Sequence, residues 1–326
     1  MTAKRKRAPG AGRKLATDSD MSARKDTATA APMVCGIAIT HGSRVIWPGV
    51  TKLDLARYYE AVGPWLVPHL WRRPLTLVRC PDGTQGECFY QRHLLMAASP
   101  GAVQTYKRER GSRAPYMYVE TIEAVISTVQ NGAVEFHTSG STVPDVAHPD
   151  RFTLDLDPGP GVQWPTLVAA AKLTKQFLDT LELKSFIKTT GGNGLHIAVP
   201  IAPDLGWPEI TEFTRDIAQM LSKVRPDLFL ATMAKQHRAG KIFLDYLRNS
   251  GEIRTAVAAY SARARARPTV SVPVEWEEID DDDIRGIFTI KSVLRRLTKQ
   301  RRDPWADYWA LRQPITPTMR AALRAT

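Results

Sequence analysis

Apolar and polar residues alternate along several segments of the chain, which is typical of strands with one buried face. In FTLDLDP, residues 152–158, a phenylalanine and two leucines alternate with Thr153, Asp155 and Asp157, and a PGPG turn sequence follows. The same criterion predicts further strands at Leu75–Arg79, Glu87–His93, Ala133–Thr138, Ser185–Thr190, Leu195–Ile201, Lys241–Leu247 and Thr255–Arg265.

Apolar residues at spacings of three and four predict helices between these strands. One helix begins after Thr51, which is a suitable N-cap residue. The other predicted helices are Thr121–Asn131, Trp164–Leu183, Pro208–Val224 and Asp303–Arg324. Strands and helices mix without a regular βαβ alternation, so we expect an α+β fold. Residues 1–32 lack apolar periodicity and are predicted to be a disordered basic tail, followed by one domain over residues 33–326.

Composition narrows the class of protein. Of the 326 residues 43% are hydrophobic, enough for a sizeable core, and no apolar run is long enough to span a bilayer or to form a secretory signal. Cys35, Cys80 and Cys88 lack the pairing of metal ligands and fit a reducing cytosol, so no disulfide framework is expected.

The net charge of +12 favours a polyanionic partner, nucleic acid before an anionic membrane. Eight basic and three acidic residues in the tail account for +5, which leaves +7 on the body of the chain. The tail either touches DNA phosphates non-specifically or serves as a solubilising extension. Many basic enzymes bind only small anions, so charge alone does not identify the partner.

Four segments carry candidate chemistry. Asp155 and Asp157 project from one strand face roughly 7 Å apart and could hold divalent cations, although a solvated strand end is the alternative. The sequence KTTGGNGLH, residues 188–196, could cradle a phosphate with backbone N–H groups or be an ordinary hairpin turn. Asp245 interrupts an apolar strand, so it needs a cation: either Arg248 or a metal.

The fourth segment is AVAAYSARARAR, residues 256–267, which is predicted to place Arg263, Arg265 and Arg267 on one strand face. These cations could receive a triphosphate or a nucleic-acid backbone, and a charged solvent face is the alternative.

Together these segments resemble the three ordered motifs of the archaeo-eukaryotic primase superfamily. Within it, the chain resembles the polymerase domain of bacterial end-joining DNA ligase D over about residues 37–305. The segments that carry the resemblance are THGSRVIWPGVTKLDLARYY, RPLTLVRCPDG, CFYQRH, FTLDLDP, TTGGNGLHIAVP, IFLDYLRN, TAVAAYSARAR and DPWAD. The resemblance implies a primase-like core of mixed and antiparallel sheets flanked by helices.

The resemblance also implies roles for individual residues. Two metal ions, Mn²⁺ or Mg²⁺, would be bound by Asp155, Asp157 and Asp245, and would activate a primer 3′-hydroxyl towards an NTP or dNTP. Nucleotide-binding residues would be His137, Thr190, His196, Arg238, Arg248 and Arg263. The 5′-phosphate of a DNA gap or break would be bound by His41, Arg44 and Lys52, and template bases would stack on Phe89 and Tyr90, for which core packing is the alternative.

The sequence departs from the family pattern at a few positions. Thr190 stands where Ser is usual and keeps the hydroxyl, whereas Asn193 replaces a frequent Lys and removes a cation near the phosphates. The step from Arg44 to Lys52 is about two residues shorter than usual, and Ser250–Arg254 is about one residue longer. No K-x-D-G ligase motif occurs in the chain.

The sequence therefore predicts a nucleotidyltransferase that fills gaps at DNA ends in non-homologous end joining. The resemblance implies a preference for Mn²⁺ and ribonucleotides, a location in the bacterial cytoplasm, and contacts with the end-binding protein Ku and a separate ligase. The alternatives are a primase that starts chains de novo and a non-catalytic module that binds DNA ends. An Asp-x-Asp glycosyltransferase would leave Asp245 and the basic body unexplained.

Overall fold

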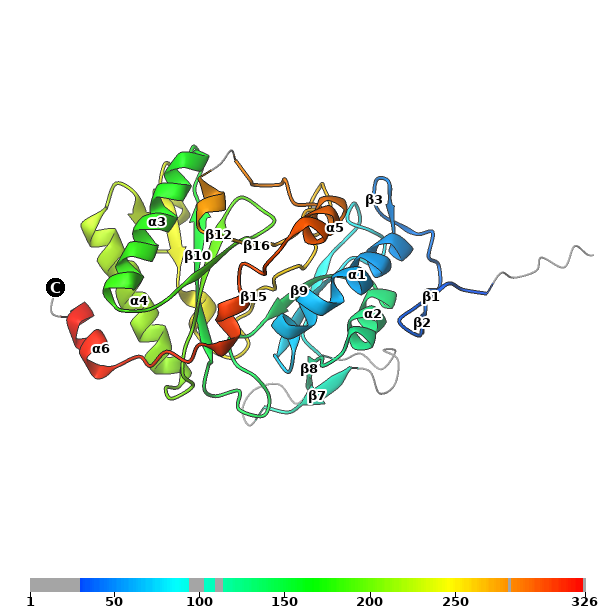
Figure 1. Cartoon of the computed structure of the whole chain (residues 1–326), viewed down its shortest axis with the longest axis horizontal. Coiled ribbons are helices and arrows are strands. Elements are labelled where there is room, and N and C mark those ends of the chain that lie inside the picture. Colours follow the sequence, from blue (N-terminus) through cyan, green and yellow to red (C-terminus); the bar gives the residue numbers. More distant parts are fainter. Residues whose placement is uncertain (1–29, 94–102, 109–113, 281–282, 325–326) are drawn as a thin grey trace, which may run out of the picture. The chain divides into compact units, whose positions relative to one another are not determined.

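Two β-sheets form the centre of the structure, and helices cover the outer side of each (Figure 1). The structure is a computed structural model that describes residues 30–93, 103–108, 114–280 and 283–324. The tail predicted for residues 1–32 lies outside the described residues, apart from residues 30–32. Helices combined with mostly antiparallel strands confirm the α+β class.

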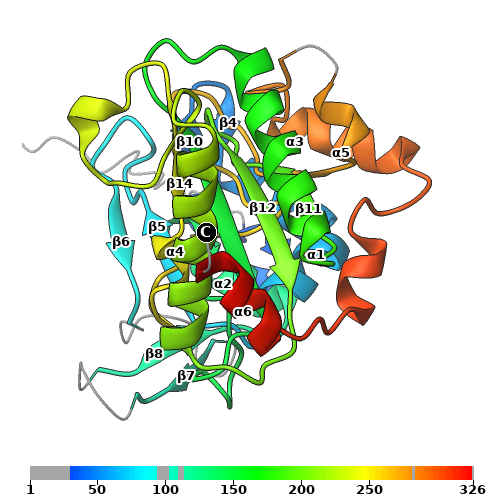
Figure 2. The same ribbon diagram turned by 90° about the vertical axis from the view of Figure 1, so that its left-hand side faces the viewer.

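The larger sheet is built around the aspartate-bearing strand. Its order is β13-β14-β10-β12-β11-β16, antiparallel except for the parallel pair β13 and β14. Leu154 and Leu156 of β10 are fully buried, and α3 and α4 cover the face to which they belong (Figure 2). The elements are β10 Arg151–Pro158, α3 Trp164–Thr180, β11 Phe186–Thr189, β12 Leu195–Pro200, α4 Trp207–Val224, β13 Phe229–Leu230, β14 Ile242–Asp245 and β16 Pro273–Val274.

The smaller sheet has the order β15-β9-β5-β6, and α1 and α2 pack on it. Thr51 caps α1 as predicted: its hydroxyl accepts a hydrogen bond from the N–H of Asp54, whose carboxylate in turn accepts from the N–H of Thr51. The elements are α1 Lys52–Leu70, β5 Leu75–Arg79, β6 Phe89–Gln91, α2 Ile122–Gln130, β9 Ala133–Thr138 and β15 Ala256–Val257.

Three short hairpins and several helical segments complete the described chain. No helix within these residues is both long and apolar enough to cross a bilayer. The hairpins are β1 Met33–Val34 with β2 Ile37–Ala38, β3 Val45–Trp47 with β4 Val50–Thr51, and β7 Gln104–Tyr106 with β8 Tyr116–Tyr118. The remaining segments are α5 Ile290–Lys299, α6 Pro317–Arg324 and the 3₁₀ helices η1 Lys235–His237, η2 Leu247–Asn249, η3 Glu277–Ile279 and η4 Ala306–Ala310.

The strand predicted over residues 255–265 is wrong for most of its length. Within this segment only β15 is a strand, and it pairs with β9. The strand ends because Tyr260 adopts a left-handed conformation (φ 63°) and the N–H of Ser261 donates to the carbonyl of Ala258. Beyond this turn, Arg263 N donates to the carbonyl of Thr269, so the chain reverses. The arginines of this segment consequently do not share one strand face.

The C-terminal prediction is also wrong in part. In place of one helical segment over residues 303–324, the chain forms η4, an extended stretch and then α6. Pro314 and Pro317 explain the interruption, because a residue that precedes proline avoids the helical conformation. Trp305, immediately before η4, is buried in a small aromatic cluster with Phe186 and Tyr308.

The structure contradicts the expectation that the cysteines stay reduced. Cys80 and Cys88 form a disulfide across the loop that joins β5 to β6. Cys80 directly follows β5 and Cys88 directly precedes β6, so antiparallel pairing of the two strands brings the thiols together. Sequence spacing alone could not reveal this, because it does not show that the two strands are neighbours. Cys35 remains a free thiol.

Candidate active site

Three carboxylates converge where β10 and β14 pair. Asp155 and Asp157 are two residues apart on β10 and therefore project from the same face. The antiparallel register sets Asp155 opposite Asp245 of β14. One oxygen from each of the three side chains lies within 4.8 Å of the others. The structure thus brings together the three acids that the sequence singled out.

A histidine and an arginine contact this acidic cluster. Strand β12 sets His196 opposite Asp155, with 3.2 Å between His196 Nε2 and Asp155 Oδ1. Arg248 lies in η2, directly after β14, and its Nε donates to Asp155 Oδ2 at 3.1 Å and lies 3.5 Å from Asp245 Oδ2. Burial opposes ionisation of Asp155, but His196 and Arg248 hold its pKa below the ordinary value. The cation expected beside Asp245 is therefore present as Arg248.

At the other two acids the effect of burial on the pKa outweighs that of the nearby arginines. Burial and the neighbouring Asp155 raise the pKa of Asp157 to about 7, and burial also raises the pKa of Asp245. The buried Oδ1 atom of Asp155 has the 3.2 Å contact with His196 Nε2 but no hydrogen bond of good geometry with the described residues. Three converging carboxylates, which offer oxygen ligands only, suit a hard divalent cation. These residues therefore fit Mg²⁺ or Mn²⁺.

The glycine-rich turn between β11 and β12 packs against the same strand. A Cβ on Gly194 would lie 2.5 Å from the carbonyl oxygen of Leu156, so the close approach requires glycine. The Thr190 hydroxyl donates to the Gly194 carbonyl at 3.0 Å and accepts from the N–H of Gly192 at 3.2 Å. In this structure the hydroxyl therefore stabilises the turn, and its predicted bond to a phosphate stays a prediction.

The smaller sheet contributes a buried acid that sequence reasoning missed. Glu135 of β9 accepts hydrogen bonds from His137 Nε2 at 2.7 Å, Arg263 Nε at 3.0 Å and Ala264 N at 2.6 Å. Arg263 also donates to the Thr190 carbonyl. A signal existed in the sequence: Glu135 and His137 share one face of a strand whose other side chains are apolar or small, and an acid in such a place needs partners.

One cavity of about 690 Å³ is lined by residues of both sheets. Its lining also includes Arg92, Arg254 and Arg265; the sequence had not indicated Arg92 or Arg254. Isolated arginines on loops carry no pattern by which they could have been found. The predicted site residues in its lining are Tyr90, His137, Asp155, Asp157, Thr190, His196, Arg238, Asp245, Arg248 and Arg263.

The aromatic pair lies on the edge strand β6, where Tyr90 lines this cavity and Phe89 belongs to the opposite face of the strand. The exposed fractions of Phe89 and Tyr90 are 40% and 71%, which rules out core packing as their role. The Arg79 guanidinium lies 5.4 Å from the centre of the Phe89 ring, and Tyr90 makes an edge contact with His137. An exposed aromatic ring in the lining of a cationic cavity, here Tyr90, can stack on bases of any identity.

The predicted 5′-phosphate residues form a separate group at the start of α1. Lys52 is 5% exposed and its Nζ donates to the Thr40 carbonyl at 2.9 Å. Arg44 lies beside it, since its backbone carbonyl accepts from Lys52 N at 2.8 Å and its Nη1 donates to the Pro81 carbonyl at 2.6 Å. His41 is exposed, and its carbonyl accepts from Arg44 N. Burial and the neighbouring Arg44 lower the pKa of Lys52 to about 8.

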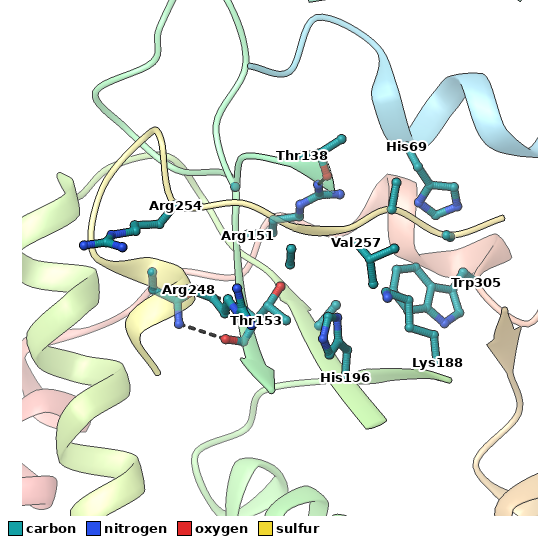
Figure 3. A pocket seen from close by; sticks show the side chains of 16 residues that line it. His69, Thr138, Arg151, Thr153, Lys188, His196, Arg248, Arg254, Val257 and Trp305 are labelled. Atoms are coloured by element: carbon teal, nitrogen blue, oxygen red, sulfur yellow. Dashed lines mark hydrogen bonds between the residues drawn. The ribbon is translucent and has the colours of Figure 1, made fainter. Parts of the chain in front are cut away.

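A second, small cavity of about 30 Å³ lies beside His196 and Arg248, two residues that also line the large cavity (Figure 3). It is lined by His69, Arg151, Lys188 and His196, and the buried Nδ1 of His196 has no hydrogen-bond partner among the described residues. Lys188, opposite His196 in the sheet, donates to Ser271 Oγ at 2.7 Å. A polar cavity of this size can hold an ordered water that satisfies Nδ1.

Comparisons with known proteins found chains of similar sequence. The family model of the LigD primase-polymerase domain matches residues 51–305. The multifunctional non-homologous end joining protein LigD of Pseudomonas aeruginosa is 40% identical over 305 residues, which are 92% of this chain and 36% of that protein. The bifunctional non-homologous end joining protein LigD of Bacillus subtilis is 30% identical over 260 residues, which are 79% of this chain and 41% of that protein.

A solved structure of a LigD polymerase domain has a similar fold. The polymerase domain from Mycobacterium tuberculosis ligase D, in complex with DNA, matches with a TM-score of 0.75 and 30% identity. The match covers 81% of this chain and 95% of that chain. This chain spans a little over a third of the length of the curated relatives named above. It belongs to the family of LigD primase-polymerase domains.

Proposed function

We propose that this member of the LigD primase-polymerase family is a metal-dependent nucleotidyltransferase that extends DNA 3′ ends during non-homologous end joining. The observation that carries the proposal is the convergence of Asp155, Asp157 and Asp245 within 4.8 Å in a cavity lined by arginines. Acids alone would repel a triphosphate and arginines alone would not activate a hydroxyl, so the combination favours phosphoryl transfer.

Asp155, Asp157 and Asp245 would hold the divalent ions. Bound there, the ions would supply the positive charge that lowers the pKa of a primer hydroxyl and neutralises the reacting phosphates. The protein's own residues perform the remaining tasks. Arg248 favours the ionised form of Asp155 and holds Asp155 and Asp245 in place through its contacts with both carboxylates. Arg238 and Arg263, at the edge of the same cavity, offer cations to the triphosphate.

The surroundings of the cavity favour gap filling over de novo priming. Phe89 and Tyr90 give a stacking surface for template bases. His41, Arg44 and Lys52 form a separate cationic group that suits a phosphate monoester. A primase that starts chains on single strands has no need for a downstream 5′-phosphate. We accordingly propose DNA gaps or breaks with a 5′-phosphate as the substrate.

The finer assignments rest on the family resemblance. We propose Mn²⁺ as the favoured ion, ribonucleotides as the preferred substrates, and Ku and a DNA ligase as partners in the joining reaction. The P. aeruginosa and M. tuberculosis relatives are named multifunctional non-homologous end joining proteins, which supports a role in the same process.

The test is primer extension on a one-nucleotide-gapped duplex, with and without the downstream 5′-phosphate, in Mn²⁺ and in Mg²⁺. NTPs and dNTPs are compared in parallel. Asp155→Ala and Asp157→Asn are expected to lower the extension rate by about a thousandfold or more while DNA affinity changes by less than about threefold. Asp179→Asn, at an exposed acid paired with Lys175, is the matched control and should retain full activity.

Unchanged extension by the Asp155 and Asp157 variants would refute the proposed metal site. Tight DNA binding by the unmodified protein without extension under any condition would instead identify a non-catalytic end-binding module. Dinucleotide synthesis on single-stranded template, with no stimulation by a 5′-phosphate, would favour the priming role.

A further inference from the structure

Glu135 connects three nucleotide-binding candidates that come from separate parts of the chain. Its Oε2 atom accepts from both His137 Nε2 and Arg263 Nε, while its Oε1 atom accepts from the backbone of Ala264. Through Arg263, which also donates to the Thr190 carbonyl, the contact chain reaches the glycine-rich turn of the other sheet. One carboxylate of the smaller sheet therefore holds residues on both sides of the cavity.

The bonding pattern determines which nitrogen of His137 carries a proton. Burial opposes ionisation of Glu135, but the hydrogen bond from His137 and the charge of Arg263 lower its pKa to about 2, so the carboxylate only accepts hydrogen bonds. The histidine nitrogen that faces it, Nε2, must then be the protonated one. Burial lowers the pKa of His137, which favours the neutral ring. A neutral ring with a proton on Nε2 has a bare lone pair on Nδ1.

This lone pair is available to a ligand. His137 lines the large cavity, and within residues 30–93, 103–108, 114–280 and 283–324 no group is hydrogen-bonded to its Nδ1 atom. An acceptor at this place suits a hydroxyl group, which can donate a proton, and does not suit a phosphate oxygen, which cannot. Among the groups of a nucleotide, the sugar hydroxyls and the exocyclic amino groups of the bases can donate in this way, and the family resemblance implies that His137 lies near the sugar.

We propose that Glu135 is a positioning residue that fixes His137 as the Nε2–H tautomer, with Nδ1 accepting from a sugar hydroxyl, and that orients Arg263 towards the phosphates. This inference rests on the proposed function for the identity of the ligand. The tautomer and its dependence on Glu135 are properties of the free protein and can be tested separately.

The first experiment is a long-range ¹⁵N–¹H correlation spectrum of the imidazole groups in the free protein, with His137 assigned from a His137→Gln variant. The expected result is the Nε2–H pattern in the unmodified protein and its loss or mixing in Glu135→Gln. An Nδ1–H pattern in the unmodified protein overturns the proposal, whatever the enzymatic activity turns out to be.

The second experiment compares single-nucleotide addition from an NTP with addition from a 2′,3′-dideoxynucleotide, which lacks both sugar hydroxyls. For Glu135→Gln we expect KM for the NTP to rise between about three- and tenfold, the range for loss of one hydrogen bond, with a smaller change in kcat. The KM for the dideoxynucleotide should rise less, because this substrate has no sugar hydroxyl that could donate to His137 Nδ1. Equal losses for both substrates would show a merely structural role and refute the proposed hydroxyl contact.

Asp150→Asn is the matched control for burial. Asp150 also accepts from an arginine, Arg73, through two bonds of 2.7 and 2.8 Å, but it does not line the cavity. Its replacement should lower thermal stability without changing the His137 spectrum or the ratio between the two substrates. A shift of that ratio in Asp150→Asn as large as in Glu135→Gln would also refute the specific role. If the unmodified protein adds no nucleotide at all, the proposed function fails, and the spectrum still decides whether Glu135 sets the tautomer.

Discussion

Lys52 should make stimulation by a 5′-phosphate depend on pH. Lys52 is 5% exposed, and its ammonium group uses one of its three donors on the Thr40 carbonyl, which leaves donors for a phosphate. Burial and the charge of Arg44 lower its pKa to about 8. A lysine with a lowered pKa is charged below that value and neutral above it, so the phosphate contact is complete below about pH 7 and is lost as pH rises through 8.

The size of the effect follows from these contacts. A hydrogen bond that involves charged groups contributes about 1.5–3 kcal/mol, which corresponds to roughly 10- to 150-fold in affinity. Lys52→Ala should reduce the preference for 5′-phosphorylated gaps by this factor. With a pKa of about 8, the charged fraction of Lys52 falls from about nine tenths at pH 7 to about one tenth at pH 9. The phosphate keeps its two charges over this range, since its second pKa is about 6.

The assay is equilibrium binding of gapped duplexes, with and without the 5′-phosphate, at subsaturating DNA and constant ionic strength from pH 6.5 to 9. The ratio of the two affinities is expected to fall about tenfold between pH 7 and 9 in the unmodified protein. Lys52→Arg should keep a ratio that does not change with pH, because a guanidinium stays charged throughout. Lys184→Ala, at an exposed lysine paired with Asp307, should behave like the unmodified protein.

Two results would refute this reasoning. Retention of the phosphate preference by Lys52→Ala would show that the pocket lies elsewhere. A preference that is lost in Lys52→Ala but constant to pH 9 in the unmodified protein would show that the lysine keeps an ordinary pKa.

Two further predictions concern the template surface and the glycine-rich turn. Tyr90→Ala and Phe89→Ala should weaken binding of a template overhang by about 1–3 kcal/mol per lost stacking contact, measured by fluorescence anisotropy, with little change in melting temperature because both rings are exposed. Equal weakening for a blunt duplex without overhang would contradict the stacking role. Gly194→Ala should lower both thermal stability and extension rate, because the added Cβ would lie 2.5 Å from the Leu156 carbonyl oxygen. A fully active, equally stable variant would show that the turn is not constrained there.

Local pattern was sufficient wherever one segment determines its own structure. The alternation of FTLDLDP predicted β10 and the common face of Asp155 and Asp157, and Thr51 predicted the start of α1. The strand prediction for the segment after β15 was wrong, because its arginines follow a turn at Tyr260 that alternation does not reveal. The disulfide between Cys80 and Cys88 was not predicted for a related reason, since it depends on the pairing of β5 with β6.

The amino-acid sequence by itself determined the fold class, the order of the motifs and the residue types available for phosphoryl transfer, because these depend on side-chain period and chemical identity. Only the tertiary structure decided which of those side chains meet. The register of β10 with β14 set Asp245 opposite Asp155, and the packing of the two sheets closed a cavity around them. The hydrogen bonds of Glu135 likewise join residues from β9 and from the chain beyond β15. Such contacts depend on distances in space between segments far apart in the chain, which no local pattern encodes.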